Sequence, residues 1–290
     1  MATNTPFGQR LGLVLEGGAM RGIYTAGVLD VFLEAGIMPD VVVGVSAGAL
    51  HGCSYVAGQK GRSIRYYRKY RSDKHFMGLY SLLTTGDVVG TKFCYEDIPL
   101  RLDPFNEAAF EKAPVDFYVT VTNVRTGKPE YILCDELKVG SKMDVIRAGA
   151  SMPLCSKMVE WNGNLYLDGG VSDSIPYAKM KDFGCRKSIV VLTQPAGYLK
   201  QPAAMAPFEA MYRKYPAFVE AMRGRDQMYN TEVCAVEQAA KQDDVFLIRP
   251  SKFLHVGRME HDIEVLNAQY ELGRQDARNQ MDAMREWMEK

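Results

Sequence analysis

The stretch VVVGVSAGALHGCSYV, residues 41–56, decides the fold. Val41–Val45 is an apolar run typical of a buried strand, and the small residues after Ser46 favour a helix. The junction, Gly44-Val45-Ser46-Ala47-Gly48, has the G-x-S-x-G pattern of a sharp turn that exposes a serine hydroxyl as a nucleophile. Gly44 and Gly48 flank the serine because side chains do not fit at the shoulders of so tight a turn. The ordinary alternative is a corner in which the serine caps the helix.

A strand and a helix are also predicted immediately before this stretch. Leu11–Leu15 is apolar and typical of a buried strand, and Ile23–Ala35 has the apolar spacing of a helix that ends at Gly36. With the strand at 41–45 they make a β-α-β unit, whose strands are expected to be parallel and adjacent. The loop after the first strand and the turn at Ser46 should therefore meet at the carboxyl edge of the sheet, the usual place for a site in an open α/β sheet.

The loop between the first strand and the first helix is rich in glycine and holds five candidate site residues. Such loops bind phosphate or stabilise an anion, but the second strand ends without the acidic residue of a dinucleotide site, and the loop lacks a G-K-[ST] ending. We therefore expect its backbone N–H groups to form an oxyanion hole opposite the serine. The arginine orders the loop, attracts an anionic head group, or is an ordinary surface side chain at the start of a helix. The candidates are Gly17, Gly18, Ala19, Arg21 and Gly22.

Composition narrows the class of protein. The 290 residues are 47% apolar and 24% charged, as in a globular protein with a substantial core. The 35 basic and 35 acidic residues cancel, so no overall field favours nucleic acid. Six scattered cysteines without a C-x-x-C pair predict buried thiols in a reducing compartment and no zinc site. No signal region and no run of ~18 apolar residues is found, so we expect a cytoplasmic protein.

A basic stretch at residues 62–75 admits more than one interpretation. RSIRYYRKYRSDKH combines six basic residues with three tyrosines, which suits nucleic acid, anionic lipid, or an amphipathic helix with a solvated basic face. We favour the helix, because the neutral net charge weakens the nucleic-acid alternative. Residues 78–104 that follow have no clear period, and a segment covering the substrate is one interpretation.

The rest of the chain predicts two hairpins and further helices in a single α/β domain over residues 1–290. Its motif-bearing core covers about 10–195, and a mostly helical extension covers about 200–290. Apolar alternation and turn signals predict strands at 115–121, 130–133, 157–161, 165–167, 188–193 and 245–248. Helical spacing predicts one helix at 142–150, two within 206–240, whose methionines and aromatics should be core, and a long one at 262–290.

A serine nucleophile needs a nearby base. Asp168 is the favoured candidate, because it ends a strand and Gly169-Gly170 lets a tight turn present its carboxylate. The alternative is a Ser-His-Asp esterase that uses His255 or His261, although only 45 residues precede Ser46, fewer than that topology requires. His51 follows the serine in the same helix and should point away from it.

Three motifs in order, EGGAMRG at 16–22, GVSAG at 44–48 and DGG at 168–170, resemble those of the patatin-like phospholipases. The resemblance covers roughly residues 10–195 and implies an open, mainly parallel sheet flanked by helices, a three-layer α/β/α fold. It implies Ser46 as nucleophile, Asp168 as general base and an oxyanion loop at 17–22, with no metal and no cofactor. The chain departs from the family at Glu16, where an aspartate is usual, and at Ala19, where a glycine is usual.

The resemblance implies a function as a serine acyl hydrolase that cleaves carboxylic esters of lipids, of phospholipase A, lysophospholipase or esterase type. Its partner would be a lipid or another acyl ester, with room for a transient contact with a membrane surface, and nucleic acid is not expected. A lipid-binding protein with little turnover is the alternative from another class, and Glu16 and Ala19 are its only support in the sequence.

Overall fold

A single open sheet runs through the computed structural model, which describes residues 6–290. Its strand order is β5-β6-β3-β2-β1-β7-β8, with β4 paired to β3. The five strands from β3 to β8 along this order are parallel, and β4, β5 and β6 join antiparallel. The strands are β1 (Arg10–Leu15), β2 (Val41–Val45), β3 (Asp116–Asn123), β4 (Pro129–Leu133), β5 (Val159–Trp161), β6 (Asn164–Asp168), β7 (Cys185–Val191) and β8 (Val245–Ile248).

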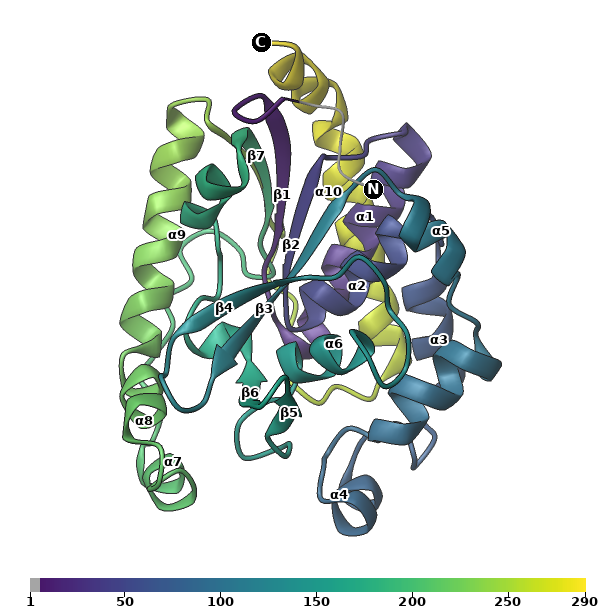
Figure 1. Cartoon of the computed structure of the whole chain (residues 1–290). Helices are drawn as coiled ribbons and strands as arrows, with labels where there is room; N and C mark the ends of the chain where they lie inside the picture. The colour runs from purple at the N-terminus through teal and green to yellow at the C-terminus, as the bar shows by residue number, and fades with distance from the viewer. Residues whose placement is uncertain (1–5) are drawn as a thin grey trace.

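Helices cover both faces of the sheet (Figure 1), so the expected mainly parallel α/β/α fold is confirmed. Alternate side chains of each strand enter opposite layers: Leu13 packs in the core with α1, α2 and α10, and Val14 packs in the core with α9. The helices are α1 (Ile23–Ala35), α2 (Ala47–Val56), α3 (Arg62–Tyr70), α4 (Leu79–Thr85), α5 (Glu107–Lys112), α6 (Met143–Gly149), α7 (Ala206–Met211), α8 (Pro216–Arg223), α9 (Arg225–Lys241) and α10 (Ile263–Glu289). The other helical elements are the 3-10 helices η1 (Ala19–Gly22), η3 (Gly169–Val171) and η4 (Ala178–Phe183) and the π-helix η2 (Phe93–Leu102).

The last helix, α10, lies directly against the first, α1, although the two helices are separated in the sequence by nearly all the other elements of the fold. A Cβ atom added to Gly273 would lie 2.1 Å from the carbonyl oxygen of Tyr24, so the two backbones meet where glycine permits it. The Tyr24 hydroxyl donates to Asp276 at 3.0 Å, and the Tyr270 hydroxyl donates to Asp30 at 2.5 Å. The carboxyl-terminal residues thereby complete one layer of the fold.

Most predicted elements are confirmed, and α1, β2 and β8 have the predicted bounds. The prediction of two helices within 206–240 is wrong, because α7, α8 and α9 lie there. Of the methionines and aromatics in α7 and α8, Phe218 and Met222 are buried as expected, but Met211 is exposed. Cys234 is also exposed, against the expectation of buried cysteines.

The basic stretch at 62–75 forms the predicted helix, α3, but its arginines are not uniformly solvated. Arg62 and Arg71 are buried, so the expectation of a solvated basic face is wrong for these two side chains. Arg71 donates to the carbonyl oxygens of Glu260 at 2.7 Å and Met259 at 2.8 Å, and so holds the loop before α10. Residues 78–104, for which the sequence shows no period, contain α4 and η2.

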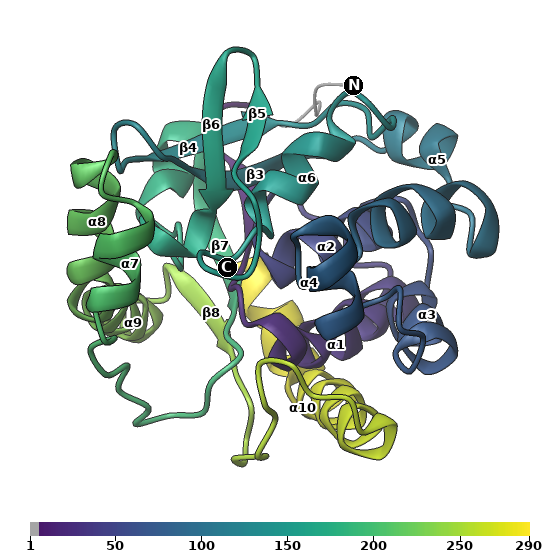
Figure 2. The same cartoon turned by 90° about the horizontal axis from the view of Figure 1, so that it is seen from below.

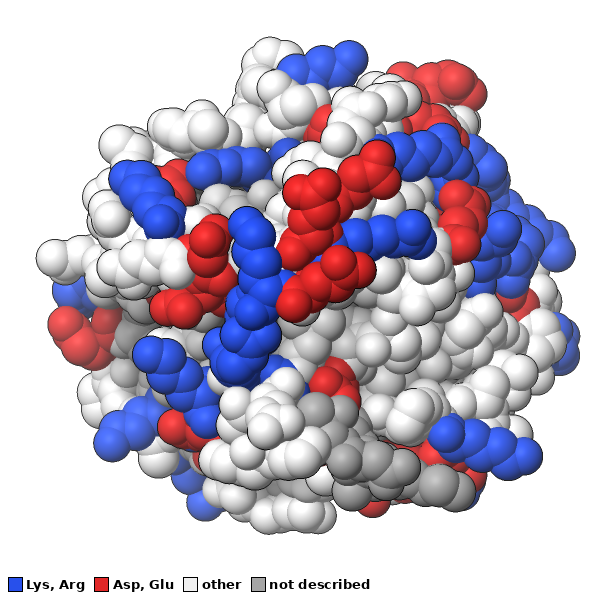
Figure 3. All heavy atoms as spheres, turned by 90° about the horizontal axis from the view of Figure 1, so that it is seen from above, with Lys and Arg blue, Asp and Glu red and all other residues white. Residues whose placement is uncertain are grey.

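The two edges of the sheet differ in what surrounds them. The parallel strands run downward in Figure 1, so the carboxyl edge faces the viewer of Figure 2, where α4, α7 and the β5–β6 hairpin surround it. The opposite edge, seen in Figure 3, shows basic and acidic side chains intermixed over its surface.

Candidate active site

Ser46 lies on a strained turn between β2 and α2. Its φ of 52° and ψ of −121° are unusual for a residue with a side chain, and such strain is typical of a serine held on a nucleophile elbow. The Ser46 side chain makes no capping hydrogen bond to α2, so the alternative of an ordinary helix-capping serine is wrong. The hydroxyl points instead toward Asp168 at the end of β6.

Ser46 Oγ donates a 2.5 Å hydrogen bond to Oδ2 of Asp168, 122 residues away in the chain. The sheet order explains the contact, because β6 pairs with β3 and β3 pairs with β2, which brings the ends of β2 and β6 together. The other carboxylate oxygen, Oδ1, accepts from the Gly170 N–H at 2.8 Å. Asp168 is buried, and burial raises its pKa, while the hydrogen bond from Ser46 and the charge of Arg225 oppose that rise.

Two pockets open at Ser46, and none of the four histidines lines either of them. His51 is buried on α2, its Nδ1 lies 3.1 Å from Ser63 Oγ, and burial lowers its pKa to about 3, so its ring is neutral. His255 and His261 lie exposed on the loop between β8 and α10. Within residues 6–290, the hydrogen-bond partner of the serine is the aspartate, and the Ser-His-Asp alternative has no histidine in place.

The glycine-rich loop lies against the serine. A Cβ atom on Gly17 would come within 2.9 Å of Ser46 Cβ, so only glycine permits this approach. Within the described part of the chain, the N–H groups of Gly17, Gly18 and Ala19 make no hydrogen bond to another backbone group. Ala19 has a φ of 49°, a left-handed conformation that glycine adopts more easily, so the departure from the family at this position strains the backbone.

Glu16, the residue just before the glycine-rich loop, fixes the start of that loop to the residues that follow β7 and to α9. It is buried, accepts from the Thr193 N–H at the end of β7, and is hydrogen-bonded to the Tyr229 hydroxyl on α9. Burial raises the pKa of Glu16, while these hydrogen bonds and the charge of Arg21 oppose the rise. The remaining predicted glycines serve close packing: an added Cβ would lie under 3 Å from neighbouring atoms at Gly22, Gly44, Gly48 and Gly169, and 3.1 Å from Asp168 at Gly170.

An apolar chamber, here called the acyl chamber, opens at Ser46 and follows α2. Ala47, Leu50 and Cys53, which are spaced three residues apart, present one face of the helix to it. The chamber encloses about 910 Å³ of empty space, the solvent at its mouth included. Its other walls come from the loop at 19–20, α3, the segment 76–99, Phe105, α6 and the loop at 150–152.

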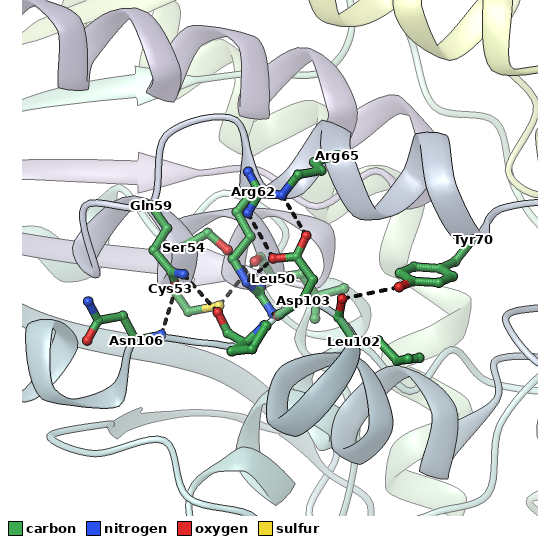
Figure 4. Close-up of polar contacts among 11 residues, drawn as sticks. Leu50, Cys53, Ser54, Gln59, Arg62, Arg65, Tyr70, Leu102, Asp103 and Asn106 are labelled. Atoms are coloured by element: carbon green, nitrogen blue, oxygen red, sulfur yellow. Dashed lines mark hydrogen bonds and ion pairs between the residues drawn. The ribbon is translucent and has the colours of Figure 1, made fainter.

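The far end of the acyl chamber is closed by a buried arginine. Arg62 lines the chamber, and its Nη1 donates to Ser54 Oγ at 3.2 Å, near the far end of α2. Arg62 and Arg65 converge on Asp103 (Figure 4), to which Arg65 donates two hydrogen bonds of 2.7 and 2.8 Å. From Ser46 to Ser54 the helix advances roughly 12 Å, about the extended length of an acyl chain of ten carbons.

A second chamber, here called the cationic chamber, lies on the other side of Ser46. The loop residues Gly17, Gly18, Ala19 and Arg21 line it together with Ser46 and Asp168. The carboxyl-terminal third adds side chains that motif analysis missed, because each is a single polar residue without a local pattern. These are Lys200, Arg225, Tyr229 and Arg258.

This fold, with a serine on a strained strand-to-helix turn at the carboxyl edge of an open sheet, defines the class of α/β acyl hydrolases. Residues 13–180 match the family described as patatin-like phospholipase, and the chain belongs to that family. Membership places the chain among lipid ester hydrolases. Residues 215–289 match a domain of unknown function, DUF6363.

Several proteins are similar to this chain. The uncharacterized protein YjjU of Escherichia coli (strain K12) is 28% identical over 273 residues, which cover 91% of this chain and 75% of that protein. The lysophospholipase nte1 of Aspergillus terreus is 30% identical over 182 residues, and NTE1 of Saccharomyces cerevisiae is 30% identical over 190. These alignments cover 61% and 63% of this chain but only 11% of each lysophospholipase. The crystal structure of VipD from Legionella pneumophila superposes with a TM-score of 0.48 and 13% identity, covering 96% of this chain and 67% of that one.

Proposed function

We propose that the chain is a serine acyl hydrolase that cleaves carboxylic esters of lipids with Ser46 as nucleophile and Asp168 as general base. The observation that carries the proposal is the 2.5 Å hydrogen bond from Ser46 Oγ to Asp168 Oδ2, at the junction of an apolar and a cationic chamber. The names of the similar lysophospholipases agree with this chemistry.

In the first half of the reaction, Asp168 accepts the hydroxyl proton as Ser46 Oγ attacks the ester carbonyl carbon. Negative charge develops on the carbonyl oxygen, and the unbonded N–H groups of Gly17, Gly18 and Ala19 are the proposed donors to it. The tetrahedral intermediate collapses, the alcohol leaves with the proton from Asp168, and an acyl-serine ester remains. Water then attacks this ester and gives a proton to Asp168. The second tetrahedral intermediate collapses as Asp168 returns that proton to Ser46 Oγ, which releases the fatty acid and restores the serine hydroxyl.

The different linings of the two chambers support one placement of the two sides of the ester. The acyl chain enters the acyl chamber, because its walls are apolar and burying methylene groups there contributes about 0.8 kcal/mol each. The leaving alcohol faces the cationic chamber, which Asp168 also lines. The proton that Asp168 carries is therefore on the side where the alcohol departs.

The test is hydrolysis of p-nitrophenyl esters of increasing acyl length by the wild type and by Ser46→Ala, together with labelling by a fluorophosphonate probe. We expect turnover and labelling in the wild type and neither in Ser46→Ala. Absence of both turnover and labelling in the folded wild type would favour a lipid-binding protein without turnover. Labelling that persists in Ser46→Ala would exclude Ser46 as the nucleophile.

A transient membrane contact is proposed through α4, which lies at the lower end of the molecule in Figure 1. Leu79 and Leu83 are 70% and 76% exposed, and α4 lies between Met77 and Val89, which both line the acyl chamber. Exposed apolar side chains next to these two lining residues would let a lipid pass from a bilayer into the acyl chamber and so to the serine. Among residues 6–290, no helix is both long and apolar enough to cross a membrane.

Vesicle co-sedimentation tests this contact. The double variant Leu79→Ser, Leu83→Ser should bind phosphatidylcholine–phosphatidylglycerol vesicles several-fold more weakly than the wild type, because two exposed apolar side chains are lost. Met38→Ser is the matched control, since Met38 is also exposed but precedes β2 at the opposite edge of the sheet. Equal vesicle binding by all three proteins would refute a contact through α4.

A further inference from the structure

Four cations that line the cationic chamber form no ion pair with a carboxylate of residues 6–290. Elsewhere in residues 6–290, buried or half-buried arginines such as Arg10 and Arg274 form ion pairs. The chamber cations take part in none of the ion pairs that the described residues form, and the Nε atom of Arg21 is buried without a hydrogen-bond partner. These cations are Arg21, Lys200, Arg225 and Arg258.

The carboxylates of the chamber do not neutralise this charge. The chamber is lined by two of them, Glu16 and Asp168, and each is already hydrogen-bonded to protein groups. Even with both carboxylates ionised, as Asp168 must be to act as a base, four cations face two anions. The chamber therefore has an excess of positive charge beside the nucleophile.

One of the cations is held by its own side chain, and the backbone at or next to two others is fixed by hydrogen bonds. Arg225 donates from Nε to the carbonyl oxygen of Gly170 at 2.5 Å, next to the turn that presents Asp168. The backbone of Lys200 makes two hydrogen bonds with the side chain of Asn230 on α9, of 2.9 and 3.1 Å. The loop that carries Arg258 is held by Arg71, which donates to the carbonyl oxygens of the two residues after it. The Arg258 side chain itself is exposed, and the side chains of Lys200 and Arg225 are half-buried.

The cations also repel one another. The pKa of Lys200 is lowered to about 8, first by burial and then by the neighbouring positive charges of Arg225, Arg21 and Arg258, which the attraction of Glu16 only partly offsets. Burial lowers the pKa of Arg225 as well, and Arg258 and Arg21 add to that effect. Gathering like charges in a half-buried chamber costs free energy, which a bound anion would offset.

We infer that the cationic chamber is the leaving-group subsite and selects esters whose alcohol carries an acidic phosphate, above all a phosphate monoester, over neutral or choline-bearing alcohols. The inference rests on the proposed function, because it places the alcohol side of the ester in this chamber. Arginine and lysine donors suit phosphate oxygens, and a phosphate monoester presents more negative charge than a diester. A quaternary ammonium would add a fifth positive charge to the chamber, and a free glycerol would leave the four cations unpaired.

Three of the four cations come from the region after residue 195, and two of them, Arg225 and Arg258, lie within the segment that matches the domain of unknown function, 215–289. The inference therefore assigns this carboxyl-terminal region a role in the choice of head group, while the acyl chamber is built by residues before 153.

The experiment compares three octanoyl esters with one acyl chain and different alcohols: monooctanoyl glycerol, its 3-phosphate, and its 3-phosphocholine. For the wild type we expect kcat/KM for the phosphate monoester to exceed that for each of the other two by about tenfold or more, since one charge-assisted contact is worth about that factor. The short chain keeps the substrates dispersed, so the ratio reports the head group and not a membrane.

Variants then assign the preference to the chamber. Arg258→Gln and Lys200→Met should each lower the ratio of kcat/KM for the phosphate monoester over that for monooctanoyl glycerol by about fivefold to tenfold. Lys252→Gln is the matched control, because it removes an exposed positive charge six residues before Arg258 that does not line the chamber, and its ratio should equal that of the wild type.

The outcomes separate the inference from the proposed function. Equal or better hydrolysis of the neutral glycerol ester by the wild type would overturn the inference while leaving a serine acyl hydrolase. A preference for phosphate that survives in both Arg258→Gln and Lys200→Met would also overturn it. If no octanoyl ester is hydrolysed and the fluorophosphonate does not label Ser46, the proposed function fails instead.

Discussion

Asp168→Asn is the substitution that tests the proposed dyad most directly, because the structure predicts that it removes the base and keeps the fold. The asparagine side chain is nearly the same size, its oxygen can still accept from the Gly170 N–H, and its amide can still contact Ser46 Oγ. What is lost is the capacity to accept a proton. A positioned general base contributes about 10²–10⁴-fold, so kcat/KM should fall by that factor, or about 3 to 5 kcal/mol in the barrier.

The stability of Asp168→Asn should change in the opposite direction from its activity. Burial raises the pKa of Asp168 in the folded protein above its unfolded value, so its contribution to stability is greatest at low pH and is lost as the pH rises through the folded pKa. At a pH above the folded pKa the ionised carboxylate therefore opposes folding, and the neutral amide should leave Tm equal or higher. In the wild type, kcat/KM should fall as the pH drops through the raised pKa, since only the ionised aspartate is a base.

The assay combines p-nitrophenyl ester kinetics, fluorophosphonate labelling and thermal unfolding of Asp168→Asn at pH 8, with Asp173→Asn as a control. Asp173 is a nearby carboxylate that accepts from Tyr131 and does not line either chamber, so its loss should leave the dyad in place. A well-folded Asp168→Asn with more than about a tenth of wild-type kcat/KM would refute the assignment of the base. A large fall in Tm would show instead that the carboxylate serves mainly to hold the fold.

Further predictions concern the turn, the loop, the acyl chamber and a buried carboxylate pair. Gly44→Ala should destabilise the protein by about 1–3 kcal/mol in chemical denaturation, because the added Cβ would lie 2.5 Å from the Ala49 backbone of α2. Ala19→Gly should relieve the left-handed strain, and Tm should not fall by more than a few degrees, whereas Ala19→Val should lower it clearly. Cys53→Phe should shift the preferred acyl chain to shorter esters and Cys53→Ala should not, since Cys53 lines the acyl chamber between Ser46 and Arg62. Burial beside Asp173 raises the pKa of Glu232, which accepts from the Ser174 and Ile175 N–H groups. Its contribution to stability should therefore be lost as the pH rises through that raised pKa, and Glu232→Gln should flatten the dependence of Tm on pH above neutrality.

Local sequence patterns predicted most of the elements of this protein and the two residues of the proposed dyad. Val41–Val45 is apolar along its whole length because a central parallel strand is buried on both faces, and Gly36 ends α1 because it lies in the left-handed region. Ser46 and Asp168 can be recognised in the sequence as candidate site residues, because the tight turns that present them require glycines at fixed spacing. Each of these signals is short-range, so the sequence carries it without knowledge of the fold.

The tertiary structure alone decided what surrounds Ser46. In the sheet, β7 and β8 follow β1 on one side, and β3 and β6 follow β2 on the other side. Residues 150 or more positions apart in the chain therefore converge on one edge of the sheet. Lys200, Arg225 and Arg258 have no common period or motif, and only this convergence gathers them beside Arg21. Likewise, the burial of Arg62 depends on Asp103 and Ser54, which helical spacing within α3 does not reveal. Local propensity therefore set the strands, helices and turns, and long-range packing, which depends on the order of strands and on the side chains facing each cavity, set the chambers and their charge.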